Sequence, residues 1–132
     1  MKTIRVAAAI IEHEGKILAT QRGYGENKDG WEFPGGKIEP EESPEDAIVR
    51  EIKEELSADI VVKQLLTTVE YDYPKFHLSM DCFMAELKPG SDIKLLEHED
   101  MTWLKVSELD SLDWLPADIE VVKAIKSYLG IK

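Results

Sequence analysis

The chain has 132 residues, of which 43% are hydrophobic, and its formal net charge at pH 7 is −11. A chain of this length and hydrophobic content can bury one core, so we expect a single domain over residues 1–132. The negative charge argues against a nucleic-acid polymer or an anionic membrane as a partner, because both bind basic surfaces.

The N-terminal part of the sequence predicts a hairpin followed by a loop. Residues 4–11 are rich in Val, Ala and Ile, and residues 16–22 form a second extended run after the turn-like EHEG. The polar, glycine-containing stretch GYGENKDG at residues 23–30 predicts a loop, and such loops often border functional sites. The extended WEF then leads to a break in the chain at Pro34, Gly35 and Gly36.

A helix is predicted from Ser43 to about Ser57. Pro44 takes the first helical position, and acidic residues in the first turn favour the positive end of the helix dipole. Apolar residues on one side of this helix are expected to pack inward. They are Ile48, Val49, Ile52 and Leu56.

The C-terminal half predicts three more strands and a second helix. Residues 60–73 and 76–87 predict two strands around YPK, and residues 101–105 predict a short third strand. A terminal helix is predicted at residues 116–129, with an apolar stripe that we expect in the core. The stripe consists of Ile119, Val122, Ile125 and Leu129. This order of elements predicts an α/β fold with a mixed β-sheet between two helices.

The cysteine content and the N-terminal segment bear on the compartment. Cys82 is the single cysteine, so no disulfide can form within the chain, and a reducing compartment is expected. The segment MKTIRVAAAII lacks a signal-peptide cleavage site, and no apolar run reaches membrane-spanning length. We therefore expect a cytoplasmic protein.

The predicted helix at residues 43–57 carries an unusual group of acids. Glu51, Glu54 and Glu55 stand at spacings of three and four, so their carboxylates gather on one helix face with Arg50 beside them. Like charges at this spacing repel one another. Two interpretations are open: a solvated acidic surface, or a site at which Mg²⁺ neutralises the acids and bridges them to a polyphosphate.

The spacing around this helix resembles the motif of the Nudix hydrolases. Gly36, five residues, Glu42, seven residues and then the run Arg50-Glu51-Ile52-Lys53-Glu54-Glu55 reproduce the pattern G-x5-E-x7-R-E-U-x-E-E-x-G-U. Ser57 replaces the glycine of this pattern and Ala58 its bulky apolar residue, but no charged position is lost. WEFPGGKIE, YDYPKFH and LPADIEVV resemble the MutT-like branch, so the resemblance covers almost the whole chain.

The resemblance implies an α/β/α Nudix fold and metal-dependent hydrolysis of a nucleoside diphosphate linked to another group. The metal would be Mg²⁺, with Mn²⁺ as a substitute. The ligands implied by the family are Glu51, Glu54, Glu55 and the carbonyl oxygen of Gly36. Arg50 would orient Glu51, so that Arg50, Glu51 and Glu54 are the catalytic residues of the motif. Glu42 would support the geometry between the loop and the helix.

Two residues outside the motif receive roles from the same resemblance. Glu97, six residues before Trp103, stands where MutT-like proteins carry a further glutamate that binds metal or activates water, and Glu99 is its competitor. The alternative for both is a solvated acidic turn. Arg22 ends the second predicted strand, where the resemblance implies a phosphate contact, and its alternative is an ordinary surface charge.

Three residues are expected near the base of the nucleotide. Phe33 and Tyr73 stand where MutT-like proteins place an aromatic wall, and plain packing is the alternative for both. Asp118 replaces an asparagine that reads oxidised guanine in MutT. An ionised aspartate only accepts hydrogen bonds and suits the amine of cytosine most simply. Its alternative is the N-cap of the last helix.

These observations predict an enzyme that converts a nucleoside triphosphate and water into the monophosphate and pyrophosphate. LPADI and the pair Glu97-His98 resemble the CTP pyrophosphohydrolase relatives of MutT, which implies CTP, modified dCTP or oxidised nucleotides such as 8-oxo-dGTP as substrates. A second hypothesis is hydrolysis of a nucleotide sugar or a dinucleoside polyphosphate. A third, from another class, is a non-catalytic nucleotide-binding regulatory module. We expect a monomer, with a dimer as the alternative.

Overall fold

The structure is a computed structural model that describes residues 2–23, 29–94 and 100–129. Its elements follow the predicted order with small differences at their ends. They are β1 (Thr3–His13), β2 (Lys16–Gln21), β3 (Trp31–Glu32), β4 (Gly35–Lys37), α1 (Pro44–Leu56), β5 (Ile60–Tyr73), β6 (Phe76–Leu87), β7 (Asp100–Lys105), the 3₁₀ helix η1 (Val106–Ser111) and α2 (Pro116–Tyr128).

The strands form a mixed sheet centred on β1. Strand β1 pairs in parallel with β6, from Thr3 opposite His77 to Ile11 opposite Ala85, and β6 pairs antiparallel with β5. On its other side β1 pairs antiparallel with β4, where Ala7 lies opposite Gly36, and with β2 at its C-terminal end. Strands β3 and β7 then pair with β2, so one long strand connects both halves of the sheet.

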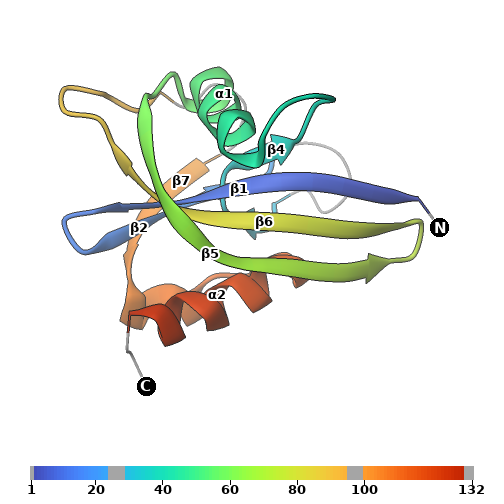
Figure 1. Cartoon of the computed structure of the whole chain (residues 1–132). Coiled ribbons are helices and arrows are strands. Elements are labelled where there is room, and N and C mark those ends of the chain that lie inside the picture. The colour runs from blue at the N-terminus through green and yellow to red at the C-terminus, as the bar shows by residue number, and fades with distance from the viewer. Residues whose placement is uncertain (1, 24–28, 95–99, 130–132) are drawn as a thin grey trace.

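The two helices cover opposite faces of this sheet (Figure 1). Buried residues of α1, such as Ile48 and Ile52, pack with Leu18 and Ile11 in one core cluster. Buried residues of α2 pack on the other face in a second cluster that includes Ile10. The predicted α/β fold with a mixed sheet between two helices is therefore confirmed.

Helix α1 begins and ends as predicted. The Ser43 side chain accepts a hydrogen bond from the Asp46 amide at 3.1 Å, and Pro44 opens the helix. Ser57 ends it in the left-handed conformation, with φ of 54°, and its amide donates to the Lys53 carbonyl at 3.1 Å. A serine thus adopts at the helix end a conformation that glycine adopts at lower cost.

Two apolar residues that we expected in the core are exposed. Val49 is 41% exposed and Ile119 is 45% exposed. Each directly follows a buried residue of its helix, Ile48 or Asp118, and stands outside the buried face. In α2 the face that packs inward contains Ala117, Asp118, Val121, Val122 and Ile125, so an acidic residue is buried while Ile119 faces outward.

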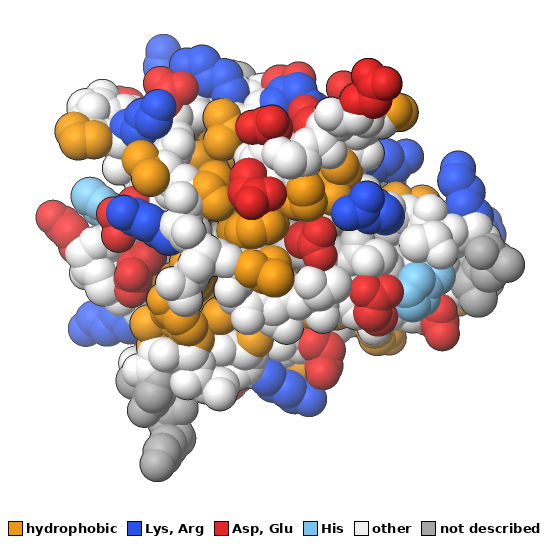
Figure 2. All heavy atoms as spheres, in the orientation of Figure 1, with side chains coloured by type: hydrophobic (Ala, Val, Ile, Leu, Met, Phe, Trp, Pro, Cys, Tyr) orange, Lys and Arg blue, Asp and Glu red, His pale blue; other side chains and the backbone are white. Residues whose placement is uncertain are grey.

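The surface carries charges of both signs. Figure 2 shows acidic and basic side chains interspersed with hydrophobic ones over the face on which α1 and β5 lie. Within residues 2–23, 29–94 and 100–129, no helix is both long enough and apolar enough to cross a membrane.

Candidate active site

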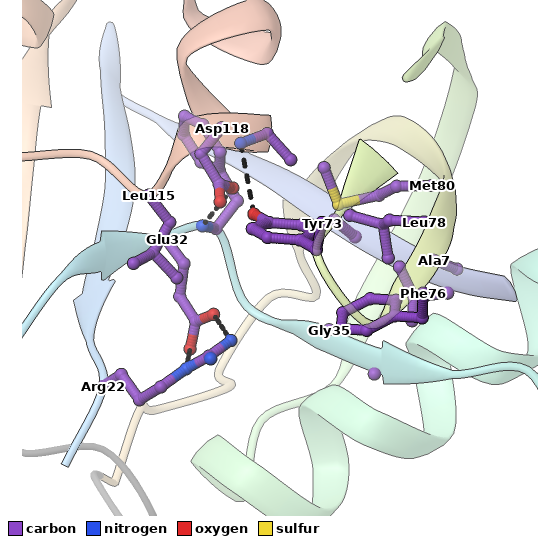
Figure 3. A pocket seen from close by; sticks show the side chains of 15 residues that line it. Ala7, Arg22, Glu32, Gly35, Tyr73, Phe76, Leu78, Met80, Leu115 and Asp118 are labelled. Atoms are coloured by element: carbon purple, nitrogen blue, oxygen red, sulfur yellow. Dashed lines mark hydrogen bonds and ion pairs between the residues drawn. The ribbon is translucent and has the colours of Figure 1, made fainter. Parts of the chain in front are cut away.

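A cavity of about 220 Å³ opens between the edge of the sheet at β4, the β5–β6 hairpin and the N-terminus of α2 (Figure 3). It is bounded by backbone and small side chains on one side and by aromatic and apolar side chains on the other. Its lining residues include Arg22, Glu32, Phe33, Gly36, Tyr73, Phe76 and Asp118. Three of the residues predicted near the base, Phe33, Tyr73 and Asp118, therefore line one cavity.

Asp118 is an almost completely buried acid in the wall of this cavity. It is 6% exposed, and its Oδ1 accepts a hydrogen bond from the Phe33 amide at 3.2 Å. Burial, followed by the nearby charge of Glu32, raises the pKa of the Asp118 carboxyl to about 8. The helix-cap alternative is wrong, because the N-cap residue of α2 is Leu115.

The raised pKa also corrects the expected charge of Asp118. We expected an ionised carboxylate that only accepts hydrogen bonds. At pH 7 the carboxyl lies below its pKa and is mostly protonated, so Asp118 can donate from one oxygen and accept at the other. Sequence reasoning missed this because the charge state depends on burial beneath residues distant in the chain.

Glu32 is a cavity residue to which the sequence analysis assigned no role. Its carboxylate pairs with Arg22 through two contacts, Nη2 to Oε1 at 2.6 Å and Nε to Oε2 at 3.5 Å. Both side chains line the cavity, and Figure 3 shows this pair at one end of it. The sequence signal that could have identified Glu32 as a site residue is its position as the single acid between Trp31 and Phe33 in the extended WEF.

The aromatic residues of the cavity divide between packing and lining. The Phe33 ring is 4% exposed and stacks on Trp114, with ring centroids 4.6 Å apart and planes 19° apart. The Tyr73 ring stacks on Phe76 at 5.1 Å and 25°, so these two form a wall from the β5–β6 hairpin. The Tyr73 hydroxyl accepts a hydrogen bond from the Ala117 amide at 3.4 Å.

Arg50 organises the acids of α1. Its Nε and Nη2 bind the two carboxylate oxygens of Glu42 at 2.8 and 2.9 Å. Its Nη1 contacts Glu51 at 2.9 Å and Glu54 at 3.4 Å, and Nη2 also donates to the Lys37 carbonyl at 3.1 Å. Repulsion within the acidic group is thus partly offset by one arginine, which is held between the loop and the helix.

The pKa values of this group follow from the same contacts. The hydrogen bonds from Arg50 and from the Glu39 amide lower the pKa of Glu42 to about 2. The Glu42 carboxylate, in turn, raises the pKa of Arg50 above its ordinary value. Glu42 and Arg50 therefore both stay charged near neutral pH.

Gly36 connects the cavity to the acidic helix. A Cβ atom at Gly36 would lie 2.4 Å from Cδ of Glu51. The Glu51 carboxylate therefore occupies the space that a side chain at position 36 would need. Gly36 also lines the cavity. Gly36 therefore links the lining of the cavity to the Glu51 carboxylate.

The remaining predicted ligands differ in burial. Glu55 is 7% exposed, whereas the Glu54 side chain is 55% exposed. Within the described ranges, no three Asp, Glu, His or Cys side chains already stand in a metal-binding arrangement. Glu97, the ligand predicted in the loop, and its competitor Glu99 lie outside the described residues.

The chain is similar to proteins of known family over almost its whole length. The family model of the NUDIX domain matches residues 1–125. The CTP pyrophosphohydrolase of Escherichia coli (strain K12) is 35% identical over 125 residues, which cover 94% of this chain and 92% of that protein. The 8-oxo-dGTP diphosphatase of the same strain is 33% identical over 130 residues, covering 96% and 98%.

Solved structures extend the likeness to three dimensions. The solution structure of the E. coli ORF135 protein superposes with a TM-score of 0.84 at 34% identity, covering 96% of this chain and 91% of that one. The solution structure of a MutT protein from methicillin-resistant Staphylococcus aureus 252 gives a TM-score of 0.77 at 38% identity, covering 97% and 99%.

Proposed function

The chain belongs to the Nudix hydrolase family, and we propose that it is a Mg²⁺-dependent pyrophosphohydrolase of cytosine nucleotides and oxidised purine nucleotides. Hydrolysis would give the nucleoside monophosphate and pyrophosphate. The substrate class is supported by relatives named CTP pyrophosphohydrolase and 8-oxo-dGTP diphosphatase. We also propose that residues 1–132 act as one domain, as a monomer, in the cytoplasm.

The observation that carries this proposal is the position of Gly36. It lines the cavity that contains Asp118, and its Cα carries no side chain that would displace the Glu51 carboxylate. A nucleotide whose base lies beside Asp118 would extend its phosphates past Gly36 toward the acids of α1. The alternative substrates, a nucleotide sugar or a dinucleoside polyphosphate, would use the same acids but would not need a buried acid at the base end.

The residues at the Gly36 end fit a hard divalent cation. Nudix hydrolases use divalent metal ions, typically Mg²⁺, and carboxylate and carbonyl oxygens are the ligands that Mg²⁺ prefers. Glu51, Glu54, Glu55 and the Gly36 carbonyl would hold the ion, with Glu97 as a further ligand and Mn²⁺ as a substitute. When bound, the ion would offset phosphate charge and lower the pKa of a water molecule.

The protein's own residues would position the reaction. Arg50 holds Glu51 in place through its 2.9 Å contact, and Glu42 fixes two nitrogens of that guanidinium. The Arg50 guanidinium, held by Glu42, would keep Glu51 in one orientation beneath the substrate phosphates. Such fixed positioning of groups accelerates phosphoryl transfer. Arg22, at the cavity wall, would contact a phosphate of the bound nucleotide.

At the base end a protonated Asp118 suits the proposed substrates. It would offer one donor and one acceptor beside the wall of Tyr73 and Phe76. Cytosine presents the amine N4 as a donor and N3 as an acceptor, and a guanine derivative also presents both kinds of group along its edge. The same carboxyl can therefore serve both classes of base, and Phe33 would complete the pocket beside it.

A turnover panel with Mg²⁺ tests the proposal. The panel contains CTP, dCTP, 5-methyl-dCTP, dGTP, 8-oxo-dGTP and 2-hydroxy-dATP, each scored by kcat/KM and by whether pyrophosphate or phosphate is released. We expect pyrophosphate release, with cytosine nucleotides or 8-oxo-dGTP above unmodified dGTP. Faster turnover of ADP-ribose or a dinucleoside polyphosphate than of every triphosphate would overturn the substrate assignment.

A further inference from the structure

Helix α2, which carries Asp118, begins without a cap from its own segment. Its N-cap residue is Leu115, whose side chain has no oxygen to accept from the first turn. Pro116 has no amide hydrogen, so Ala117 is the first residue of the helix with an amide to satisfy. A helix end buried against a cavity needs an acceptor for that amide from elsewhere in the fold.

The acceptor is the hydroxyl of Tyr73, from the end of β5. It takes a hydrogen bond from the Ala117 amide at 3.4 Å, and Figure 3 shows the contact directly beside Asp118. The Tyr73 ring is held independently of this bond by stacking on Phe76 and by a tilted contact with Tyr71 at 4.8 Å. The contacts of the Tyr73 ring with Phe76 and Tyr71 therefore position its hydroxyl.

Asp118 follows Ala117 directly and is held from its other side by the Phe33 amide. The two bonds come from different parts of the fold, from β5 through Tyr73 and from the β3–β4 segment through Phe33. Because the Tyr73 hydroxyl satisfies the Ala117 amide, this amide needs no water molecule as a partner, and the adjacent Asp118 is only 6% exposed.

We propose that the Tyr73 hydroxyl is a positioning group for base recognition, which fixes the first turn of α2 and thereby the direction and hydration of Asp118. The inference rests on the proposed role of Asp118 in reading the base. It assigns Tyr73 a second contribution besides its ring: the ring lines the pocket, and the hydroxyl keeps the reading carboxyl in one orientation.

The test compares Tyr73→Phe with the matched control Tyr71→Phe, each in the full-length protein. Both variants remove one phenolic oxygen and keep the ring, but Tyr71 does not line the cavity. Carbon-13 NMR titration of the Asp118 carboxyl and hydrogen exchange of the Ala117 amide are measured without nucleotide. The ratio of kcat/KM for CTP to that for dGTP is measured with Mg²⁺.

In Tyr73→Phe we expect the Ala117 amide to exchange at least about tenfold faster. Water or the freed amide then solvates the carboxyl, so the Asp118 pKa should fall by about one unit or more. The kcat/KM ratio between the two nucleotides should move toward one by about three- to tenfold, while Tyr71→Phe leaves all three quantities unchanged.

The outcomes separate this inference from the proposed function. Faster Ala117 exchange with an unchanged Asp118 pKa and an unchanged nucleotide ratio would reduce the hydroxyl to a helix cap and overturn the inference. An equal fall in kcat/KM for both nucleotides, with the Asp118 pKa unchanged, would also overturn it. If the wild-type protein showed no preference between bases, the reading role of Asp118 would fail, and the two NMR measurements would still decide whether Tyr73 positions the carboxyl.

Discussion

The backbone amide of Phe33 donates a hydrogen bond to Oδ1 of Asp118 at 3.2 Å, although 85 positions separate the two residues in the sequence. This bond uses Oδ1 of the carboxyl as an acceptor. A neutral carboxyl offers one donor and one acceptor as an amide does, so the proposed base pocket could use an acid where the MutT-like pattern has an asparagine.

Asp118→Asn should make the protein more stable at high pH and change its pH dependence. The folded-state pKa of about 8 lies above the ordinary value of 3.8, so the folded state holds a proton that the unfolded state releases. Stability of the wild-type protein is therefore unaffected by this group below the unfolded pKa and decreases as pH rises toward 8. The variant lacks the titrating group and should not show this decrease.

Thermal unfolding at pH 5, 6, 7 and 8 measures the effect. The difference in Tm between variant and wild type should widen steadily with pH, by about 4 °C for each kcal/mol in a chain of this size. A constant difference would mean that Asp118 is ionised in the folded state throughout. In turnover at pH 7, the same variant should keep the ranking of bases, because the amide offers a donor and an acceptor as the protonated carboxyl does, and the Mg²⁺ requirement should change little.

Glu54→Gln should abolish turnover and leave the fold intact. The Glu54 side chain is 55% exposed and its one described partner is Arg50, at 3.4 Å, so its loss removes a proposed metal ligand without opening the core. We expect kcat to fall by about a hundredfold or more, with Tm within about 2 °C of the wild type.

Glu45→Gln is the matched control for this variant, because Glu45 is an exposed acid in the first turn of the same helix. It should retain wild-type kcat. Isothermal titration with Mn²⁺ adds a readout besides activity, and Glu54→Gln should bind the ion more weakly than Glu45→Gln. An active Glu54→Gln protein would remove this residue from the metal site.

Gly36→Ala and Gly35→Ala should fail in different ways. The three atoms nearest to a Cβ at Gly36 all belong to the Glu51 carboxylate, whose flexible side chain can move away, so the fold should survive while Glu51 is displaced. A Cβ at Gly35 would lie 2.1 Å from the Ala7 carbonyl oxygen and 2.7 Å from the Ala8 Cα, which are backbone atoms of the central strand.

We therefore expect Gly36→Ala to lose activity by about a hundredfold with a small change in Tm. Gly35→Ala should lower Tm strongly or yield insoluble protein, because β4 must separate from β1. Paired unfolding and kcat measurements check both. A fully active Gly36→Ala protein would argue against the Glu51 carboxylate acting from its observed position.

Ser57→Gly should stabilise the protein. Ser57 adopts the left-handed conformation at the end of α1, with φ of 54°, where a side chain is unfavourable and glycine is not. The gain should be roughly 0.5–1 kcal/mol, measured by urea unfolding, and Ser57→Ala is the control that should give none. Equal midpoints for the glycine and alanine variants would show that the helix end carries no backbone strain.

The local parts of the fold could be predicted because neighbouring residues determine them. Ser43 and Pro44 are start signals for α1 that depend only on the next turn, and the structure confirms them. Ser57 ends the helix where the Nudix pattern has glycine, because the left-handed conformation is only costly for serine and not forbidden.

The residues of the candidate site were only partly predictable because their properties depend on distant segments. The protonation of Asp118 depends on burial beneath β3 and the hairpin, and Glu32 acquires its partner, Arg22, only when β3 pairs with β2. Ile119 was placed in the core by periodicity, but the sheet packs against the neighbouring face of α2. Periodicity predicts which side of a helix is apolar, but it does not show which residues at the edge of that side the sheet covers.

The parallel pairing of β1 with β6 determines when the site can assemble. Thr3 lies opposite His77, so the pairing closes a long chain loop that contains β3, β4 and the whole of α1. Closing such a loop has an entropic cost that only later contacts offset, and non-local pairing of this kind slows folding. A ribosome-bound chain ending before Phe76 would already carry every acid of α1, yet β1 would lack its parallel neighbour and the base pocket its hairpin wall. The complete cavity can therefore form only after β6 and the start of α2 have been synthesised.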